Sequence, residues 1–159
     1  MPDPAFACDS MVGRLARWLR ILGYDATYAR DAVDARLVAQ ARAEGRVLLT
    51  RDRRLVERSG IGRFVLVRSD DPPTQLREVV AALGLTVDPA RWFRRCPACN
   101  GAVEAVARES VRGLVPPYVY GTQRSFSRCA NCGRVYWPAT HRDHMLRELE
   151  ALPDASGRG

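Results

Sequence analysis

Short apolar runs alternate with amphipathic segments along the first ninety residues, and this alternation limits the folds open to the chain. We expect strands at residues 5–8, 26–29, 46–50 and 63–68, and helices at 10–23, 34–45, 52–58 and 71–84. Strands that alternate with helices form a parallel sheet, because each crossover between parallel strands packs a helix against the sheet. The sequence therefore predicts an α/β fold in which helices cover both faces of a parallel sheet.

Acidic residues follow each of the four predicted strands. The carboxyl ends of parallel strands share one edge of the sheet, and neighbouring strands lie about 5 Å apart, so we expect these side chains at one site. Helix N-capping is the alternative for Asp34, Asp52 and Asp71, which stand where predicted helices begin. Capping explains the whole set less well, and least of all Asp9, which directly follows an apolar strand. The candidate acids are Asp9, Asp31, Asp34, Asp52, Asp70 and Asp71.

A shared cation would resolve the repulsion within such a group of carboxylates, which otherwise raise one another's pKa. Mg²⁺ and Mn²⁺ bind through one or two carboxylates together with water and substrate phosphates. Such a centre activates water and stabilises charge on a phosphodiester. The arginines near this edge are candidates for binding the phosphates of a substrate: Arg14, Arg17, Arg51, Arg53 and Arg54.

Four of the five cysteines form two Cys-x-x-Cys pairs, which are Cys96 with Cys99 and Cys129 with Cys132. Two such pairs supply four thiolates for closed tetrahedral coordination, which is typical of a structural zinc site. A redox pair and an iron–sulfur cluster are the alternatives. The residues that follow the pairs, Asn100 and Gly133, suit tight turns. Cys8 stands alone, and we expect it to be a small buried residue beside Asp9.

The composition changes near residue 90. The chain carries a net charge of +7, and residues 91–142 hold nine arginines and two acidic residues. A basic module points to a polyanion, most often nucleic acid, and a solvated arginine surface is the alternative. We therefore predict an α/β domain at residues 1–90, a zinc ribbon with a C-terminal helix at 91–150, and a frayed tail at 151–159.

Features of membrane or exported proteins are not expected. No apolar run reaches the roughly 18 residues that a membrane helix needs. The first eleven residues contain Asp3 and Asp9 and no basic residue, unlike a signal peptide. These features predict a cytoplasmic protein that does not bind membranes.

The chain resembles a known family in its most distinctive segments. Residues "AFACDSMVGRLARWLRILGYDATY", "VLLTRDRRL", "DDPPTQLREVV", "RCPACN" and "CANCGRVYWPATH" are similar to the Mut-seven C-terminal RNase domain, over about residues 5–146. The resemblance implies a PIN-like three-layer nuclease domain fused to a zinc ribbon with four cysteine ligands. It also implies RNA as the substrate, Mg²⁺ or Mn²⁺ as the catalytic metal, and a homodimer, which PIN-like proteins often form.

Site residues follow from the same resemblance. Asp9 and Asp52 match the first and third acids of PIN-like nucleases. Asp34 matches the second acid, with Asp31 as its rival, and Asp70 or Asp71 matches the fourth. The chain departs from the family pattern before His141, where Ala139 and Thr140 replace the common Gly-Ser.

Two classes of function fit these features. The first is a metal-dependent ribonuclease, in which the ribbon aids RNA binding or stability. The second is a non-catalytic RNA- or protein-binding module, whose acids serve only as helix caps. Aromatic residues of the ribbon fit either base stacking or a small core, and His141 and His144 fit RNA contacts or surface roles. A phosphoryl-accepting receiver domain is disfavoured because its site needs a lysine, and the chain has none.

Overall fold

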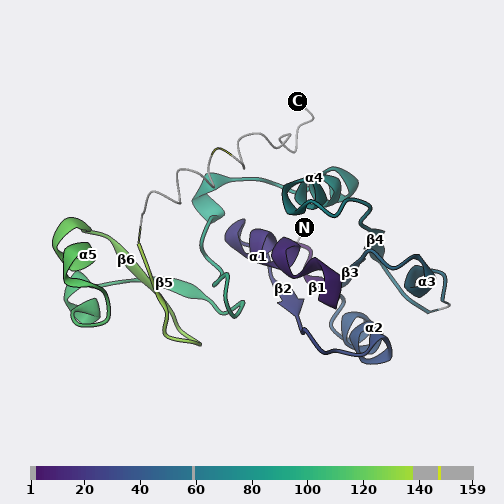
Figure 1. Ribbon diagram of the computed structural model, residues 1–159, viewed down its shortest axis with the longest axis horizontal. Helices are drawn as coiled ribbons and strands as arrows, with labels where there is room; N and C mark the ends of the chain where they lie inside the picture. Colours follow the sequence, from purple (N-terminus) through teal and green to yellow (C-terminus); the bar gives the residue numbers. More distant parts are fainter. Residues whose placement is uncertain (1–2, 59, 138–146, 148–159) are drawn as a thin grey trace.

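The computed structural model describes residues 3–58, 60–137 and 147. Its larger sheet contains four strands, all parallel, in the order β2-β1-β3-β4. The strands are β1 (Phe6–Cys8), β2 (Ala26–Tyr28), β3 (Val47–Thr50) and β4 (Phe64–Leu66). The parallel sheet predicted from the alternation of strands and helices is confirmed, and β1 and β3 form its interior (Figure 1).

Helices cover both faces of this sheet. They are α1 (Gly13–Ile21), α2 (Asp34–Ala43), α3 (Arg53–Val56) and α4 (Pro72–Leu83). Successive side chains of a strand point to opposite faces, so Phe6 and Cys8 join one core with α1 and α4. Ala7 and Leu48 join a second core with α2 and α3. The three predicted layers are therefore confirmed.

The starts of the helices differ partly from the prediction. Asp52 and Asp71 are the N-caps of α3 and α4, so the capping alternative is confirmed for these two residues. The N-cap of α2 is Val33, and Asp34 lies in the first helical turn, so the capping alternative for Asp34 is wrong. The helix predicted from residue 10 begins with a 3-10 turn, η1 (Ser10–Val12), before α1. Asp9 caps this turn, a role that its place after an apolar strand did not suggest.

A second sheet, which is antiparallel, forms the ribbon of the predicted fold class. It contains β5 (Val103–Val106), β6 (Phe126–Cys129) and β7 (Val135–Tyr136). The turns η2 (Pro89–Arg91) and η3 (Arg108–Val111) and the helix α5 (Pro117–Thr122) complete this region. The core of the ribbon includes Phe126, Tyr120 and Trp137, so these aromatics are structural, whereas Tyr118 is exposed. The C-terminal helix predicted near residues 141–152, with His141 and His144, lies outside the described residues except for Arg147.

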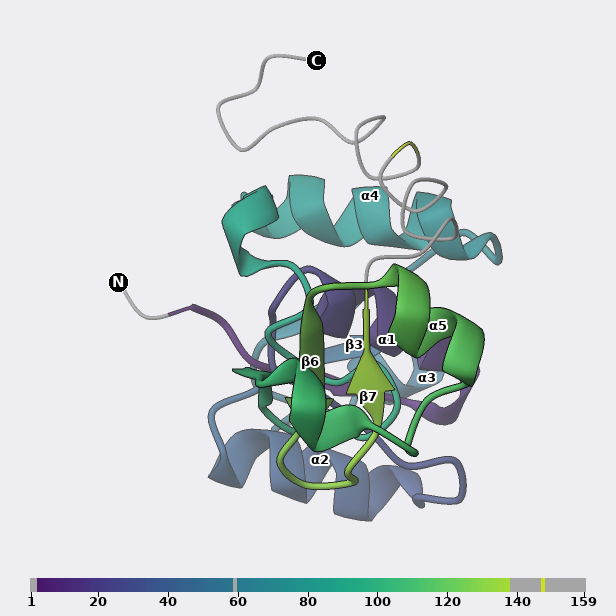
Figure 2. The same ribbon diagram turned by 90° about the vertical axis from the view of Figure 1, so that its left-hand side faces the viewer.

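The ribbon docks on the edge of the parallel sheet through its first cysteine loop. The buried guanidinium of Arg20 donates to the carbonyl oxygens of Ala26, at 2.8 Å, and of Pro97, at 2.9 Å. The side chain of Asn100 accepts from the Ala26 backbone N–H at 3.0 Å and donates to Asp25 at 2.7 Å. Figure 2 views the molecule from the ribbon side, with α4 above the ribbon and α2 below it. Trp92 and Phe93 pack against the core that β1 shares with α1 and α4. The domain boundary near residue 90 stays a prediction.

None of the helices in the described part of the chain is long and apolar enough to cross a membrane.

Replacing Arg20 with Met should lower the free energy of unfolding by about 2 kcal/mol, because two carbonyl oxygens at the junction lose a charged donor. Denaturant unfolding measures this change. Arg17→Met is the matched control, since Arg17 lies exposed on the same helix. Equal stability of the two variants would contradict the role assigned to Arg20.

Candidate functional site

Asp9 is the buried centre of the acidic edge, with only 6% of its surface exposed. It follows the last residue of β1, and its carboxylate accepts a hydrogen bond from the backbone N–H of Met11 at 2.9 Å. The hydroxyl of Thr50, the last residue of β3, donates to its other carboxylate oxygen. Thr50 in turn accepts from the Asp52 backbone N–H at 3.0 Å. Thr50 therefore joins the ends of two strands, a role that sequence reasoning missed because Asp9 lies 41 residues away in the sequence.

Asp52 and Asp34 lie on the face of the sheet that α2 and α3 cover. Asp52 caps α3 through one carboxylate oxygen, Oδ1, which accepts from the Arg54 and Leu55 backbone N–H groups at 2.9 and 3.4 Å. Asp34 is half-buried in the first turn of α2, where the helix dipole favours a negative charge. Asp31 is exposed in the loop before that helix. Asp34 is thus more buried than Asp31, the alternative candidate for the second acid.

Asp70 and Asp71 have different surroundings. Asp71 caps α4, and its carboxylate accepts from both the backbone N–H and the hydroxyl of Thr74, at 3.2 and 2.6 Å. Asp70 lines a hollow of about 370 Å³ beside Ser10 and Arg14. Of the two acids, Asp70 is therefore the one that lines the hollow next to Asp9.

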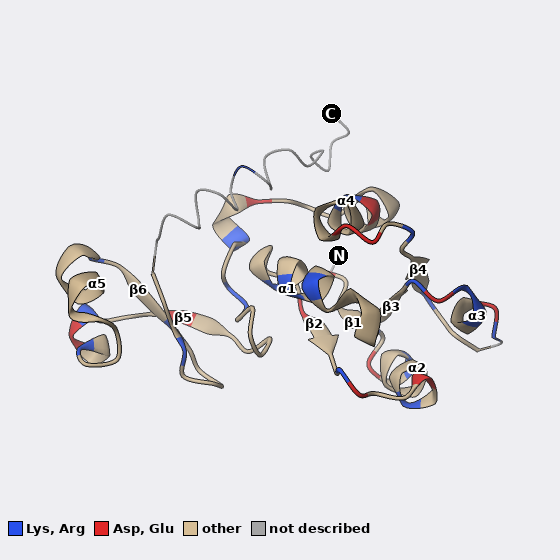
Figure 3. Cartoon of the chain, viewed as in Figure 1, with Lys and Arg blue, Asp and Glu red and all other residues tan. Residues whose placement is uncertain are grey.

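The carboxylates do not form a compact set. Across the described residues, the four cysteines are the one group of three or more acidic, cysteine or histidine side chains whose ligand atoms all lie within 4.8 Å of one another. The acids are spread because they leave the sheet on different faces: Asp34 begins a helix on one face, and Asp70 precedes a helix on the other. Figure 3 shows the red acidic segments at the starts of α2 and α4. Their shared role in metal binding stays a prediction.

The predicted phosphate-binding arginines lie on two helices and in the segment between β3 and α3. Arg14 and Arg17 are exposed on α1, and Arg14 lines the hollow that contains Asp70. Arg53 and Arg54 are exposed on α3. Arg51 is half-buried and donates to the carbonyl oxygen of Arg68 at 3.4 Å. Arg14 is thus the arginine that the structure places in the same hollow as a candidate acid.

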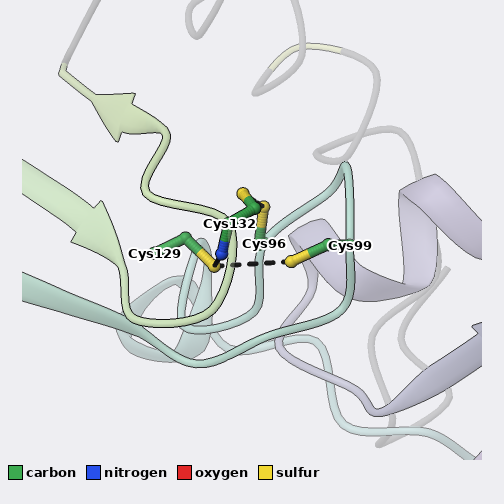
Figure 4. Close-up of side chains that lie close together, drawn as sticks. All are labelled: Cys96, Cys99, Cys129 and Cys132. Carbon is green, nitrogen blue, oxygen red and sulfur yellow. Dashed lines mark hydrogen bonds between the residues drawn. The ribbon is translucent and has the colours of Figure 1, made fainter.

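The four paired cysteines form a compact cluster (Figure 4). The sulfur atoms of Cys96 and Cys132 lie 3.7 Å apart, and those of Cys99 and Cys129 lie 3.4 Å apart. Zn–S bonds of about 2.3 Å place tetrahedral sulfur ligands about 3.8 Å from one another. The geometry therefore fits a single tetrahedral metal ion held by four thiolates.

Comparison with known proteins identifies the family. The model of the Mut7-C RNAse domain family matches residues 4–149. The chain belongs to this family. The human protein named "Exonuclease mut-7 homolog" is 38% identical over 107 residues, which are 63% of this chain and 12% of the human protein. The chain thus matches a small part of that relative's length, and no solved structure matches the chain.

Hydrogen bonds to sulfur prepare the cluster of this Mut7-C domain for a cation. The Asn131 side-chain amide donates to Cys99 at 3.4 Å and is the main cause that lowers the pKa of Cys99 to about 6. A backbone N–H of Arg134 lowers the pKa of Cys132. Burial raises the pKa of Cys129 to about 11, so this thiol stays protonated at neutral pH unless a metal binds.

Cys8 has a different environment from the cluster. It is fully buried in β1, as predicted, and burial raises the pKa of its thiol to about 12. The thiol is therefore protonated at neutral pH and unsuited to nucleophilic chemistry.

Tight turns bring the two cysteine loops together. Asn100 and Gly133 have left-handed backbones, with φ of 70° and 80°, which confirms the turns predicted after each pair. Gly101 has a further role that sequence reasoning missed. A Cβ atom there would lie 2.7 Å from the Asn131 Cβ and 2.9 Å from the Cys129 sulfur. Only glycine therefore fits between the two loops, and its place directly after Asn100 was the available signal.

Replacing Gly101 with Ala should weaken metal binding by the cluster about tenfold or more, since the added methyl group displaces a ligand and its hydrogen-bond donor. Competition with a chromophoric chelator measures the affinity. Gly121→Ala is the matched control, because a Cβ atom at Gly121 meets nothing within 4 Å. Unchanged affinity in Gly101→Ala would contradict the steric role assigned to Gly101.

Proposed function

We propose that this chain is a metal-dependent ribonuclease that hydrolyses phosphodiester bonds of RNA at the carboxyl edge of its parallel sheet. Membership of the Mut7-C RNAse domain family and the name of the human relative support this proposal. The observation that carries it is the placement of Asp9. A carboxylate that is 6% exposed at a strand end, held by Thr50 and Met11, is oriented by the fold rather than by solvent.

Hard oxygen ligands at this edge suit Mg²⁺ or Mn²⁺. Asp9 and Asp52 would hold the cation from adjacent strands, with Asp34 and Asp70 approaching from the two faces of the sheet. We prefer Asp34 to the exposed Asp31, and Asp70 to Asp71. When bound, the cation supplies an activated water and stabilises the charge that develops on the phosphate.

The protein's own groups would position the substrate. Thr50 fixes the carboxylate of Asp9, so the acid loses little freedom when the active site forms. Arg14 and Arg17 on α1 and Arg53 and Arg54 on α3 would bind phosphates on either side of the scissile bond. Arg51 is less free to do so, because it is half-buried and donates to Arg68.

The cysteine cluster would hold a structural zinc ion, since four thiolates leave no open coordination position for chemistry. We place the catalytic domain in residues 1–90 and the ribbon in residues 91–150, where the ribbon stabilises the sheet edge and aids RNA binding. Nine arginines in residues 91–142 support the second role.

A non-catalytic RNA- or protein-binding module is the second candidate. The observation that favours it is that Asp9, Asp52 and Asp71 all act as caps in this structure. If capping were their whole contribution, replacing these acids would change stability and leave RNA binding intact, with no hydrolysis to lose.

Replacing Asp9 or Asp52 with Asn should reduce metal-dependent RNA cleavage about 100-fold or more, because each variant removes a charged ligand of the cation. Asparagine is as good an N-cap as aspartate, so the substitutions keep the helix starts. Purified protein, labelled single-stranded RNA and Mn²⁺ or Mg²⁺ suffice for the assay. Asp70→Asn should reduce cleavage and Asp71→Asn should not, which tests the choice between them. The absence of cleavage by the wild-type chain, with intact RNA binding, would refute the proposal.

Metal analysis of the purified chain should give about one zinc ion per molecule. Cys99→Ser should lose this zinc, because a serine hydroxyl is a poor substitute for a thiolate. Cys8→Ala is the matched control and should retain it, since Cys8 lies in the sheet and outside the cluster. Folded wild-type protein without zinc would overturn this assignment.

A further inference from the structure

The hollow beside Asp9 is lined by several side chains that have no role in the proposed hydrolysis. Its volume is about 370 Å³, and it lies between the starts of α1 and α4 and the end of β2. Met11, Arg14, Tyr28, Asp70 and Gln75 line it. Because Met11 donates to the Asp9 carboxylate, one wall of the hollow is continuous with the proposed catalytic edge.

Tyr28 forms a rigid aromatic wall of this hollow. Its hydroxyl donates to the carbonyl oxygen of Ser10 at 3.2 Å. Its ring packs on Gly13, where an added Cβ atom would lie 2.9 Å from a ring atom. The ring is therefore held from two sides, and its orientation is set before any ligand binds.

The remaining lining offers both polar and apolar contacts. Gln75 is only 3% exposed, and its side-chain amide donates to the Ser69 carbonyl at 2.9 Å, which leaves its carbonyl oxygen as an acceptor. Arg14 is an exposed cation, and Met11 is a flexible apolar side chain with 62% of its surface exposed. An aromatic wall, a buried acceptor and a cation are the groups that contact a base, a sugar and a phosphate.

We propose that this hollow binds one unpaired nucleotide next to the phosphate that is cleaved, and that the chain thereby selects single-stranded RNA. The inference rests on the proposed function, because it places the nucleotide beside Asp9. Small-ligand pockets measure roughly 300–1,000 Å³, so the hollow, at the lower end of this range, has room for a ligand the size of one nucleotide. Proteins recognise unstacked bases by packing them on aromatic side chains, which is the surface that Tyr28 provides.

Binding of labelled RNA tests this proposal without any need for cleavage. The protein retains its zinc, and the buffer contains no Mg²⁺ or Mn²⁺, so the RNA stays intact. Tyr28→Ala should weaken binding of single-stranded RNA about 10-fold or more, whereas Tyr28→Phe should keep it. Wild-type protein should bind a duplex of the same sequence at least about tenfold more weakly than the single strand.

Two further variants make the experiment decisive. Met11→Trp fills the hollow from an exposed position, so it should weaken RNA binding without disturbing the core. Phe64→Ala is the matched control, since it removes an exposed aromatic from the first residue of β4, at the opposite edge of the sheet. Its RNA binding should equal that of the wild type. If Tyr28→Ala fails to fold, Met11→Trp decides the outcome.

The outcomes separate this inference from the proposed function. Metal-dependent cleavage with unchanged RNA binding in Tyr28→Ala and Met11→Trp would overturn the nucleotide site and leave the nuclease intact. Weakened binding in these variants, in a chain that cleaves no RNA, would support the nucleotide site and overturn the nuclease. Equal binding of single strands and duplexes would overturn the selection of single-stranded RNA.

Discussion

The central strand β1 determines where the candidate site lies. It is three residues long, its residues are fully buried, and it pairs in parallel with β2 and β3 at once. Its register places Cys8 beside Leu49, and the Asp9 backbone N–H continues the ladder by donating to the Leu49 carbonyl at 3.1 Å. Thr50, the next residue of β3, then lies within hydrogen-bond reach of the Asp9 carboxylate. The sheet itself, rather than a loop, thus positions the buried acid.

Unlike β1, which is paired on both sides, β2 lies at the edge of the sheet. Its outer backbone groups have no neighbouring strand in the described sheet. Unpaired edges invite association with other chains and are usually covered. Here the first cysteine loop covers the edge, since Asn100 accepts from the Ala26 N–H and Arg20 links the Ala26 and Pro97 carbonyls. Asn100 reaches this position because its backbone is left-handed, immediately after Cys99. The geometry of the cysteine cluster and the integrity of the sheet edge are therefore coupled.

Features encoded locally were predictable, and features that depend on packing between distant segments were not. Apolar periodicity predicted the four parallel strands and their helices, and residue spacing predicted the cysteine cluster. The short helix α5 has six residues, too few for a clear period, and was missed. The contacts of Thr50 with Asp9 and of Asn131 with Cys99 join residues that are far apart in the sequence, so no local sequence pattern predicts them. The spread of the acids over two faces depends on the helices that follow them, which strand ends alone do not specify.

Capping and metal binding, which the sequence presents as rival explanations, are compatible at Asp52. The cap of α3 uses one oxygen of the carboxylate, and a cation needs only one oxygen from each ligand. The same holds for Asp71, whose contacts to Thr74 also use a single oxygen. Capping therefore does not exclude metal binding, and the proposed choice of ligands rests on the positions of the acids. Asp52 lies two residues after Thr50, which contacts Asp9. Asp70 lines the hollow next to Asp9, whereas Asp71, the N-cap of α4, is not part of that lining. An acid that caps a helix at the end of a strand can thus also bind a metal ion, provided that the sheet places it beside another acid.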